Sequence, residues 1–172
     1  MTVYSAHPLS ALDHGVLSEI AFDAVGKDTA SALMELKSYA VQGANCIVAE
    51  DDSGIVGYIV YGPLSIFVDL SKTGDLVKRL VSEGVGKVNT ACHVHVRRAY
   101  WKTGTQLAMS RAMAENMVSN GVSHLLLYGY ATDQLAQYSL SQPGSRELPG
   151  VYDLAGRQVG VRDLRAYLAG TE

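Results

Sequence analysis

The spacing of apolar residues predicts two helices near the start of the chain. Between residues 9 and 24, apolar side chains recur every four positions, which places them on one face of a helix, and Ser10 or Asp13 is a suitable N-cap. A second helix is predicted from a cap at Asp28 to Gly43, a common helix stop. Each helix therefore has an apolar face that must pack against another element.

Runs rich in β-branched and aromatic residues predict strands around these helices. Residues 45–50 and 55–61 flank an Asp/Ser/Gly turn at 51–54, an arrangement typical of an antiparallel hairpin. Residues 3–5 are predicted to form a short first strand. The chain is thus expected to begin with a strand, two helices and a hairpin.

The second half of the chain alternates between strand and helix patterns. Strands at 89–96 and 124–130 enclose a long helix at 107–120, which predicts a right-handed crossover between parallel strands. The remaining expectations are a strand-like run at 64–70 and a helix-like run at 75–82 inside an uncertain insert at 64–88, a short helix at 133–140, a loop at 141–150, and closing strands at 151–154 and 159–168.

Composition limits the class of protein. The 172 residues are 48% apolar and 18% charged, so we expect one α/β domain over residues 1–172 rather than a disordered chain. A net charge of −3 argues against a nucleic-acid partner. Cys46 and Cys92 lie in apolar runs and are interpreted as reduced core thiols. Without a signal-peptide pattern or a run of about 18 apolar residues, we expect a cytoplasmic protein without a membrane partner.

The segment after the strand at 89–96 is the richest in candidate chemistry. Arg97, Arg98 and Lys102 precede Gly104, and the long helix begins close to that glycine. The amides of a first helical turn lack intrahelical acceptors and attract anions, while a glycine lets the backbone approach a phosphate closely. This pattern favours a diphosphate site. The alternative is an ordinary strand-to-helix loop with solvated cations.

This segment resembles the signature of the GNAT (Gcn5-related N-acetyltransferase) superfamily. The signature is Gln/Arg-x-x-Gly-x-Gly/Ala, and the corresponding window is residues 101–106. Gly104 matches the central glycine, whereas Trp101 and Gln106 depart from the first and last positions. The order of elements over residues 2–168 also follows the family. The resemblance implies a mixed, mostly antiparallel central sheet with a splayed parallel strand pair, flanked by helices on both faces.

The resemblance implies acetyl-CoA as the cosubstrate. Backbone groups at Val96 would pair with the pantetheine amides, and the amides around residues 102–106 would face the pyrophosphate. The cofactor-binding residues expected on this basis are Val96, Arg97, Arg98, Trp101, Lys102, Thr103, Gly104, Thr105 and Gln106.

Three residues are candidates for proton transfer. Tyr138 is the candidate acid for the leaving CoA thiolate, since a phenol with a pKa near 10 suits that task. His95 is a candidate base, and strand alternation places it on the same face as His93. Glu50 is a possible carboxylate, and a water chain is a further option. The alternative is that the tyrosine and both histidines only pack.

Two other motifs do not support a different chemistry. Residues 84–87 lack the flanking residues of a P-loop, and alternation separates Cys92 from His93 and His95, which argues against a metal site. The leading hypothesis is an acyl-CoA-dependent N-acyltransferase acting on an amine, either a small molecule or a protein N-terminus or lysine. The family also implies a possible homodimer. The rival is a non-catalytic binding or assembly module with the same fold.

Overall fold

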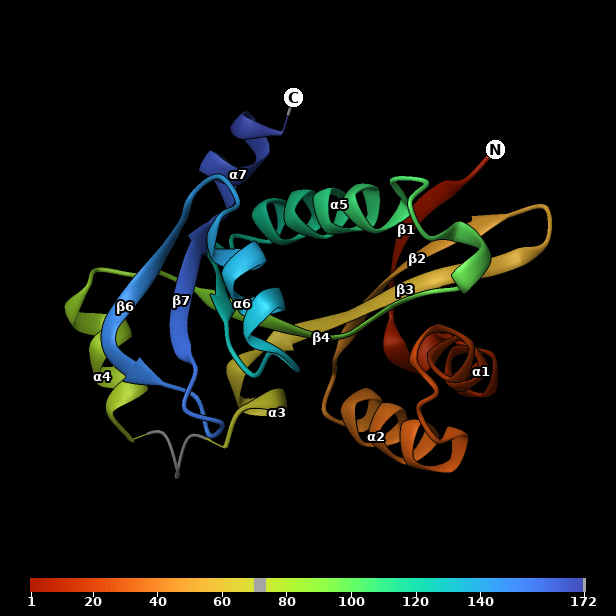
Figure 1. Cartoon of the computed structure of the whole chain (residues 1–172), viewed down its shortest axis with the longest axis horizontal. Helices are drawn as coiled ribbons and strands as arrows, with labels where there is room; N and C mark the ends of the chain where they lie inside the picture. The colour runs from red at the N-terminus through yellow and green to blue at the C-terminus, as the bar shows by residue number, and fades with distance from the viewer. Residues whose placement is uncertain (70–73, 172) are drawn as a thin grey trace. The chain divides into compact units, whose positions relative to one another are not determined.

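A computed structural model describes residues 1–69 and 74–171 of the chain (Figure 1). The seven strands form one mixed sheet in the order β1-β2-β3-β4-β5-β7-β6. The chain divides into two compact units, one comprising Met1–Gly62 and Ala91–Asn116, the other Pro63–Thr90 and Met117–Glu172. Both units draw on separate stretches of the sequence, and the expected single domain over 1–172 stays a prediction.

Three antiparallel strands run side by side in the first unit (Figure 1). β1 (Val3–Pro8) pairs with β2 (Asn45–Asp51), which pairs with β3 (Gly54–Pro63). The predicted hairpin is therefore confirmed. Gly54 has a φ of 102°, so the turn uses the conformational freedom of glycine. A register shift between Ala49 and Glu50 adds a bulge near the turn.

The two helices of this unit begin at aspartate caps, as the sequence predicts. Asp13 accepts hydrogen bonds from the first amides of α1 (His14–Val25), and Asp28 does the same for α2 (Thr29–Val41). The predicted start of the first helix at residue 9 is wrong. Residues 9–11 form a 3-10 turn, whose Leu9 is fully buried.

Helices cover both faces of the sheet in the first unit. β4 (Val88–Val96) leads through a loop to α5 (Thr105–Ser119), which begins slightly earlier than predicted. A Cβ added to Gly57 would lie 3.2 Å from Met109 of α5, so this helix packs closely on that face. The neighbouring residue Tyr58 points to the opposite face, where its ring stacks near His93.

The second unit contains the segment that the sequence left uncertain. Leu64–Phe67 form a short helix α3, so the predicted strand over 64–70 is wrong, and residue 70 lies outside the described residues. The apolar residues there follow a helical spacing and pack beside Val68. The predicted helix at 75–82 is confirmed as α4 (Gly74–Ser82), and Leu76 and Leu80 belong to the buried core.

The predicted parallel pair is confirmed. β5 (His124–Leu127) is shorter than the predicted strand at 124–130, and it pairs in parallel with β4 from Val88 to Thr90. Its other neighbour, β7 (Gln158–Asp163), is antiparallel. The sheet is therefore mixed and mostly antiparallel.

The end of the chain differs most from the sequence-based expectation. The predicted helix at 133–140 is confirmed as α6 (Asp133–Leu140), but β6 (Ser145–Tyr152) occupies much of the predicted loop at 141–150. The predicted strand at 159–168 ends at residue 163, because the Asp163 carboxylate accepts from the Ala166 amide and caps α7 (Leu164–Gly170).

Helices also cover both faces of the sheet in the second unit. Leu126 of β5, Leu148 of β6 and Val161 of β7 pack with α3 and α4 (Figure 1). On the opposite face, a Cβ at Gly160 would lie 2.5 Å from Leu140 of α6. No helix in the described part of the chain is long and apolar enough to cross a membrane.

Candidate functional site

The entrance of α5 has the geometry of an anion site. β4 ends at the buried Val96, and the loop that follows contains two residues with left-handed backbone, Lys102 (φ 66°) and Gly104 (φ 82°). α5 begins at Thr105, and its first intrahelical hydrogen bond runs from the Ala108 amide to the Gly104 carbonyl. The preceding amides of the turn lack intrahelical acceptors, and the helix dipole favours a negative charge there.

Three hydrogen bonds hold this loop against its neighbours. The Arg97 amide donates to the Val56 carbonyl of β3 at 2.9 Å, and the Arg98 amide donates to the Asp23 carboxylate of α1 at 2.8 Å. The Tyr100 hydroxyl donates to Asp51 in the hairpin. The loop is thus fixed by its own protein before any ligand binds, which lowers the entropy cost of binding.

Trp101 lies at the first position of the signature window. Its indole N–H donates to the Val96 carbonyl at 2.9 Å, and the Arg98 guanidinium carbon lies 6.0 Å from the ring centroid. The side chain is nevertheless 53% exposed. The aromatic residue that departs from the signature is therefore an oriented part of the loop surface.

The other residues of the window line the same loop. Thr103 Oγ1 lies 2.7 Å from Thr105 Oγ1 and also donates to the Tyr100 carbonyl. Lys102, Gly104 and Gln106 are exposed, and a Cβ added to Gly104 would meet nothing within 4 Å. Residues 96–106 belong to one compact unit, and the cofactor-binding role of the nine residues stays a prediction.

A partly buried polar chain in the same unit was missed by the sequence analysis. The Glu35 carboxylate of α2 accepts from His93 Nε2 at 2.6 Å and from Lys27 Nζ at 2.7 Å. With Nε2 protonated, His93 Nδ1 accepts from the Tyr58 hydroxyl at 3.3 Å. Tyr58 is fully buried and the His93 side chain is 4% exposed. Only the predicted proximity of the two histidines pointed to this region.

His93 has an unusual backbone for a strand residue. Its φ of 48° is in the left-handed region, which is costly for a residue other than glycine. Burial lowers the pKa of His93, and the hydrogen bond to Glu35 opposes that effect. The same hydrogen bond, together with that from Lys27, outweighs desolvation and lowers the pKa of Glu35. The pair therefore favours a neutral imidazole beside an ionised carboxylate at neutral pH.

His95 lies beside this chain without joining it. Its ring centroid is 5.4 Å from that of His93 and 5.5 Å from that of Tyr58, which confirms that the two histidines share a face. Its Nδ1 is buried and has no hydrogen-bond partner among the described residues. Burial, and secondarily the His93 charge, lowers the pKa of His95 to about 4. The imidazole is thus neutral at pH 7 with a free lone pair.

The other two catalytic candidates lie elsewhere. Glu50 is exposed in β2 and pairs across the bulge with Ile55. Tyr138 is on α6 in the second unit, where its side chain is 60% exposed. Among the hydrogen bonds of the described residues, neither side chain joins the histidine chain. Their roles stay predictions.

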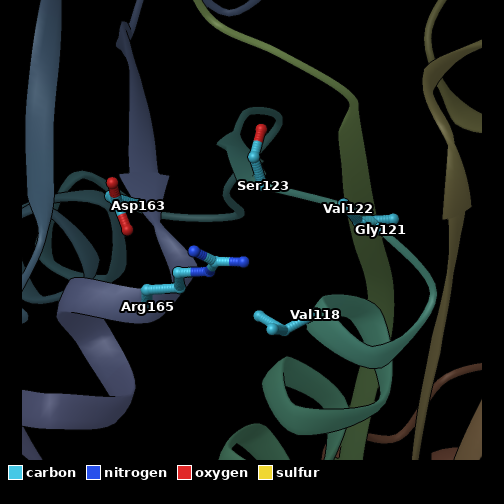
Figure 2. Close-up of a pocket in the computed structure, with 6 residues that line it drawn as sticks. All are labelled: Val118, Gly121, Val122, Ser123, Asp163 and Arg165. Carbon is cyan, nitrogen blue, oxygen red and sulfur yellow. The ribbon is translucent and has the colours of Figure 1, made fainter.

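The second unit contains a pocket that the sequence analysis did not predict. Figure 2 shows the Arg165 guanidinium reaching toward Ser123 and the end of α5, opposite Val118. Gly121, Val122 and Asp163 complete the lining. Asp163 caps α7, so its carboxylate already has a structural role. In residues 1–69 and 74–171, no group of three or more His, Cys, Asp or Glu residues could hold a metal ion.

The arrangement of elements has clear counterparts among solved structures. A protein from Desulfovibrio desulfuricans assigned to the GNAT family of acetyltransferases superposes with a TM-score of 0.65 at 12% identity, over 95% of this chain and 99% of its own. The AHL synthase LasI superposes with a TM-score of 0.61 at 12% identity, over 99% and 96% of the two chains. The chain adopts the GNAT fold.

A CoA complex is among the GNAT structures that match. The Escherichia coli N-acetyltransferase YhbS, solved in complex with CoA, superposes with a TM-score of 0.59 at 14% identity, over 95% of this chain and 81% of its own. No protein-family model and no curated protein sequence matches the chain. The GNAT assignment made from the order of elements over residues 2–168 together with the window at 101–106 is therefore confirmed at the level of the fold.

Proposed function

We propose that this protein transfers an acyl group from acyl-CoA to a primary amine, and that the acyl group is acetyl. The observation that carries the proposal is the fixed, cationic loop at the entrance of α5 in a chain with the GNAT fold. The structural similarity to YhbS, which was solved with CoA, supports the same donor. A fold alone does not define a reaction, so the donor site is the part to test first.

Residues of the loop would hold the donor by its phosphates and amides. The free amides of the first turn of α5 would face the pyrophosphate, and Gly104 would let it approach the backbone closely. Arg97, Arg98 and Lys102 would supply positive charge to the phosphates. Val96, at the end of β4, would offer its backbone to the pantetheine amides.

The reaction would be a direct attack of the amine nitrogen on the thioester carbonyl. The new C–N bond forms, the C–S bond breaks, and the amine gives up one proton while the thiolate takes one. His95 is the proposed acceptor of the amine proton, directly or through water, because its neutral imidazole has an unoccupied Nδ1. Tyr138 is the proposed proton donor to the thiolate. Holding both substrates in one site would supply much of the rate.

Two further groups could take the role of the base. Glu50 is an exposed carboxylate, and the Glu35–His93 pair carries an imidazole oriented by a carboxylate. Both His93 ring nitrogens are occupied by Glu35 and Tyr58, whereas no described residue occupies His95 Nδ1, so His95 is the preferred candidate of the two histidines. The acceptor amine is proposed as a small molecule or a protein N-terminus or lysine.

The donor site is tested by the substitution Gly104→Glu. The added carboxylate would lie where the pyrophosphate is expected, so isothermal calorimetry should find that CoA affinity is lost. Gly156→Glu is the matched control, because Gly156 has a similar φ of 76° and the same open space around a Cβ but lies outside the loop at 96–106. Unchanged CoA affinity in a folded Gly104→Glu protein contradicts the proposed function.

The acid is tested by the substitution Tyr138→Phe. Turnover should fall while CoA affinity stays close to the wild-type value, because only the phenolic hydroxyl group is removed. Equal turnover in the two proteins would remove Tyr138 from the mechanism.

One observation favours the rival function, a non-catalytic module. The Val96 carbonyl, which would accept from pantetheine, already accepts from the Trp101 indole. A carbonyl oxygen has two lone pairs, so both bonds are compatible. Acetyl-CoA should raise the thermal unfolding temperature of an enzyme and leave that of a module with no CoA affinity unchanged.

A further inference from the structure

Trp101 is an aromatic side chain held in place at the surface. The side chain is 53% exposed, although its indole N–H is bound to the Val96 carbonyl and the Arg98 guanidinium lies near its ring. Two contacts therefore restrict the ring while about half of its surface stays in contact with water. Because the ring is already oriented, little additional entropy is lost when a second flat group packs on it.

The surroundings of the ring indicate what kind of flat group this would be. Arg98 and Lys102 are exposed in the same loop, and the first turn of α5 follows directly. A ligand that uses both features must carry an aromatic ring and phosphate groups in one molecule. Nucleotides have this combination, and bases stack on tryptophan faces with useful affinity.

We propose that Trp101 stacks on the adenine ring of the donor, so that the loop selects a nucleotide-bearing thioester. This inference rests on the proposed function, which supplies the phosphate half of the site. A phosphopantetheine thioester on a carrier protein has no base and would lose the contact with Trp101. The departure from the signature at residue 101 then becomes a determinant of donor class.

The chain contains a single tryptophan, so its fluorescence reports on this residue alone. Stacking of adenine should quench the emission. Titration with CoA and with 3′,5′-ADP should therefore quench it, whereas pyrophosphate and 4′-phosphopantetheine should leave it unchanged. Equal quenching by 4′-phosphopantetheine, or no quenching by CoA at concentrations that saturate the protein, overturns the inference.

Calorimetry on two variants provides the second measurement. Trp101→Leu should weaken CoA binding about ten-fold, the loss expected for one base stack. Trp101→Phe should lose less CoA affinity than Trp101→Leu, because phenylalanine keeps an aromatic ring for stacking. It should still bind more weakly than the wild-type protein, because the indole N–H that orients the ring is gone. Tyr152→Leu is the matched control, since Tyr152 is 58% exposed, lies outside the loop at 96–106 and should keep wild-type affinity.

The outcomes separate this inference from the proposed function. If the wild-type protein binds CoA but Trp101→Leu binds it equally well, the stacking role is wrong and the donor site stands. If the wild-type protein shows no CoA binding, both are wrong. The fluorescence titration needs only the wild-type chain, so it decides the matter even if a variant fails to fold.

Discussion

The burial of neutral His95 predicts a specific loss of stability in acid. Burial lowers the pKa of His95 in the folded state to about 4, while an unfolded histidine titrates near 6.5. As the pH falls, His95 therefore takes up its proton in the unfolded chain at a higher pH than in the folded one. The contribution of His95 is complete above pH 6.5, declines as the pH falls below that value, and is fully lost below the folded pKa.

The expected size follows from the two pKa values. Their difference corresponds to about 3 kcal/mol when the loss is complete, and to about 2 kcal/mol between pH 7 and pH 5. Because the imidazole is only partly buried, solvent screening reduces the second figure to about 1–2 kcal/mol. His93 adds a loss of the same sign, because its pKa is also lowered.

The substitution His95→Phe isolates this contribution. Phenylalanine keeps a ring edge-on to Tyr58 but cannot take up a proton, and it removes the unpaired Nδ1. Urea unfolding followed by circular dichroism at pH 7 and pH 5 should show a smaller acid loss in the variant, by about 1–2 kcal/mol. His7→Asn serves as a control, and it should lose as much unfolding free energy between pH 7 and pH 5 as the wild-type protein. An equal acid loss in His95→Phe and the wild-type protein would refute the assignment.

Three further substitutions test the packing and the polar chain by urea unfolding. Gly57→Ala would place a methyl group 3.1 Å from a backbone carbonyl of β4 and should cost about 1–3 kcal/mol; an unchanged midpoint contradicts the close packing. In Gly160→Ala the added methyl group would lie 2.8 Å from the Arg146 carbonyl, so we expect a larger loss of stability than for Gly57→Ala. A smaller loss would show that β6 and β7 can separate at this position. Tyr58→Phe leaves His93 Nδ1 without a donor and should cost about 1–2 kcal/mol; no loss would mean that this hydrogen bond contributes nothing.

Local signals in the sequence were sufficient for elements that carry their own turns and caps. The hairpin of β2 and β3 was predictable because Gly54 supplies the left-handed turn residue. α1 and α2 were predictable because Asp13 and Asp28 cap them. These features act over only a few residues, so they can be recognised without knowledge of the tertiary structure.

The elements that were missed depend on contacts between distant residues. β6 contains Pro149 and Gly150 and shifts register against β7, so its sequence lacks the alternation of an ordinary strand. The run after residue 163 is apolar enough for a strand, and only the Asp163 cap turns it into α7. Propensity alone could not distinguish these outcomes.

In the candidate site, too, the part with a local sequence signal was predictable and the part built from distant residues was not. The loop at 96–106 was predictable because the signature window is contiguous, and its Gly104 adopts a left-handed backbone. The Glu35–His93–Tyr58 chain joins three separate elements, and no spacing in the sequence links them. The left-handed backbone of His93 also had no sequence signal, since the residue lies inside a run of residues that predicts an ordinary strand.

The way the chain uses its carboxylates explains how a protein with a net charge of −3 retains a cationic site. Asp23 and Asp51 lie beside the basic loop, yet Asp23 accepts from a backbone amide and Asp51 accepts from the Tyr100 hydroxyl. The ion pairs found among the described residues include none of the loop cations Arg97, Arg98 and Lys102. The acidic residues thus fix the loop through neutral donors and leave its cations available for a phosphate-bearing ligand. Net charge therefore says little about this site, since the local arrangement of donors sets its potential.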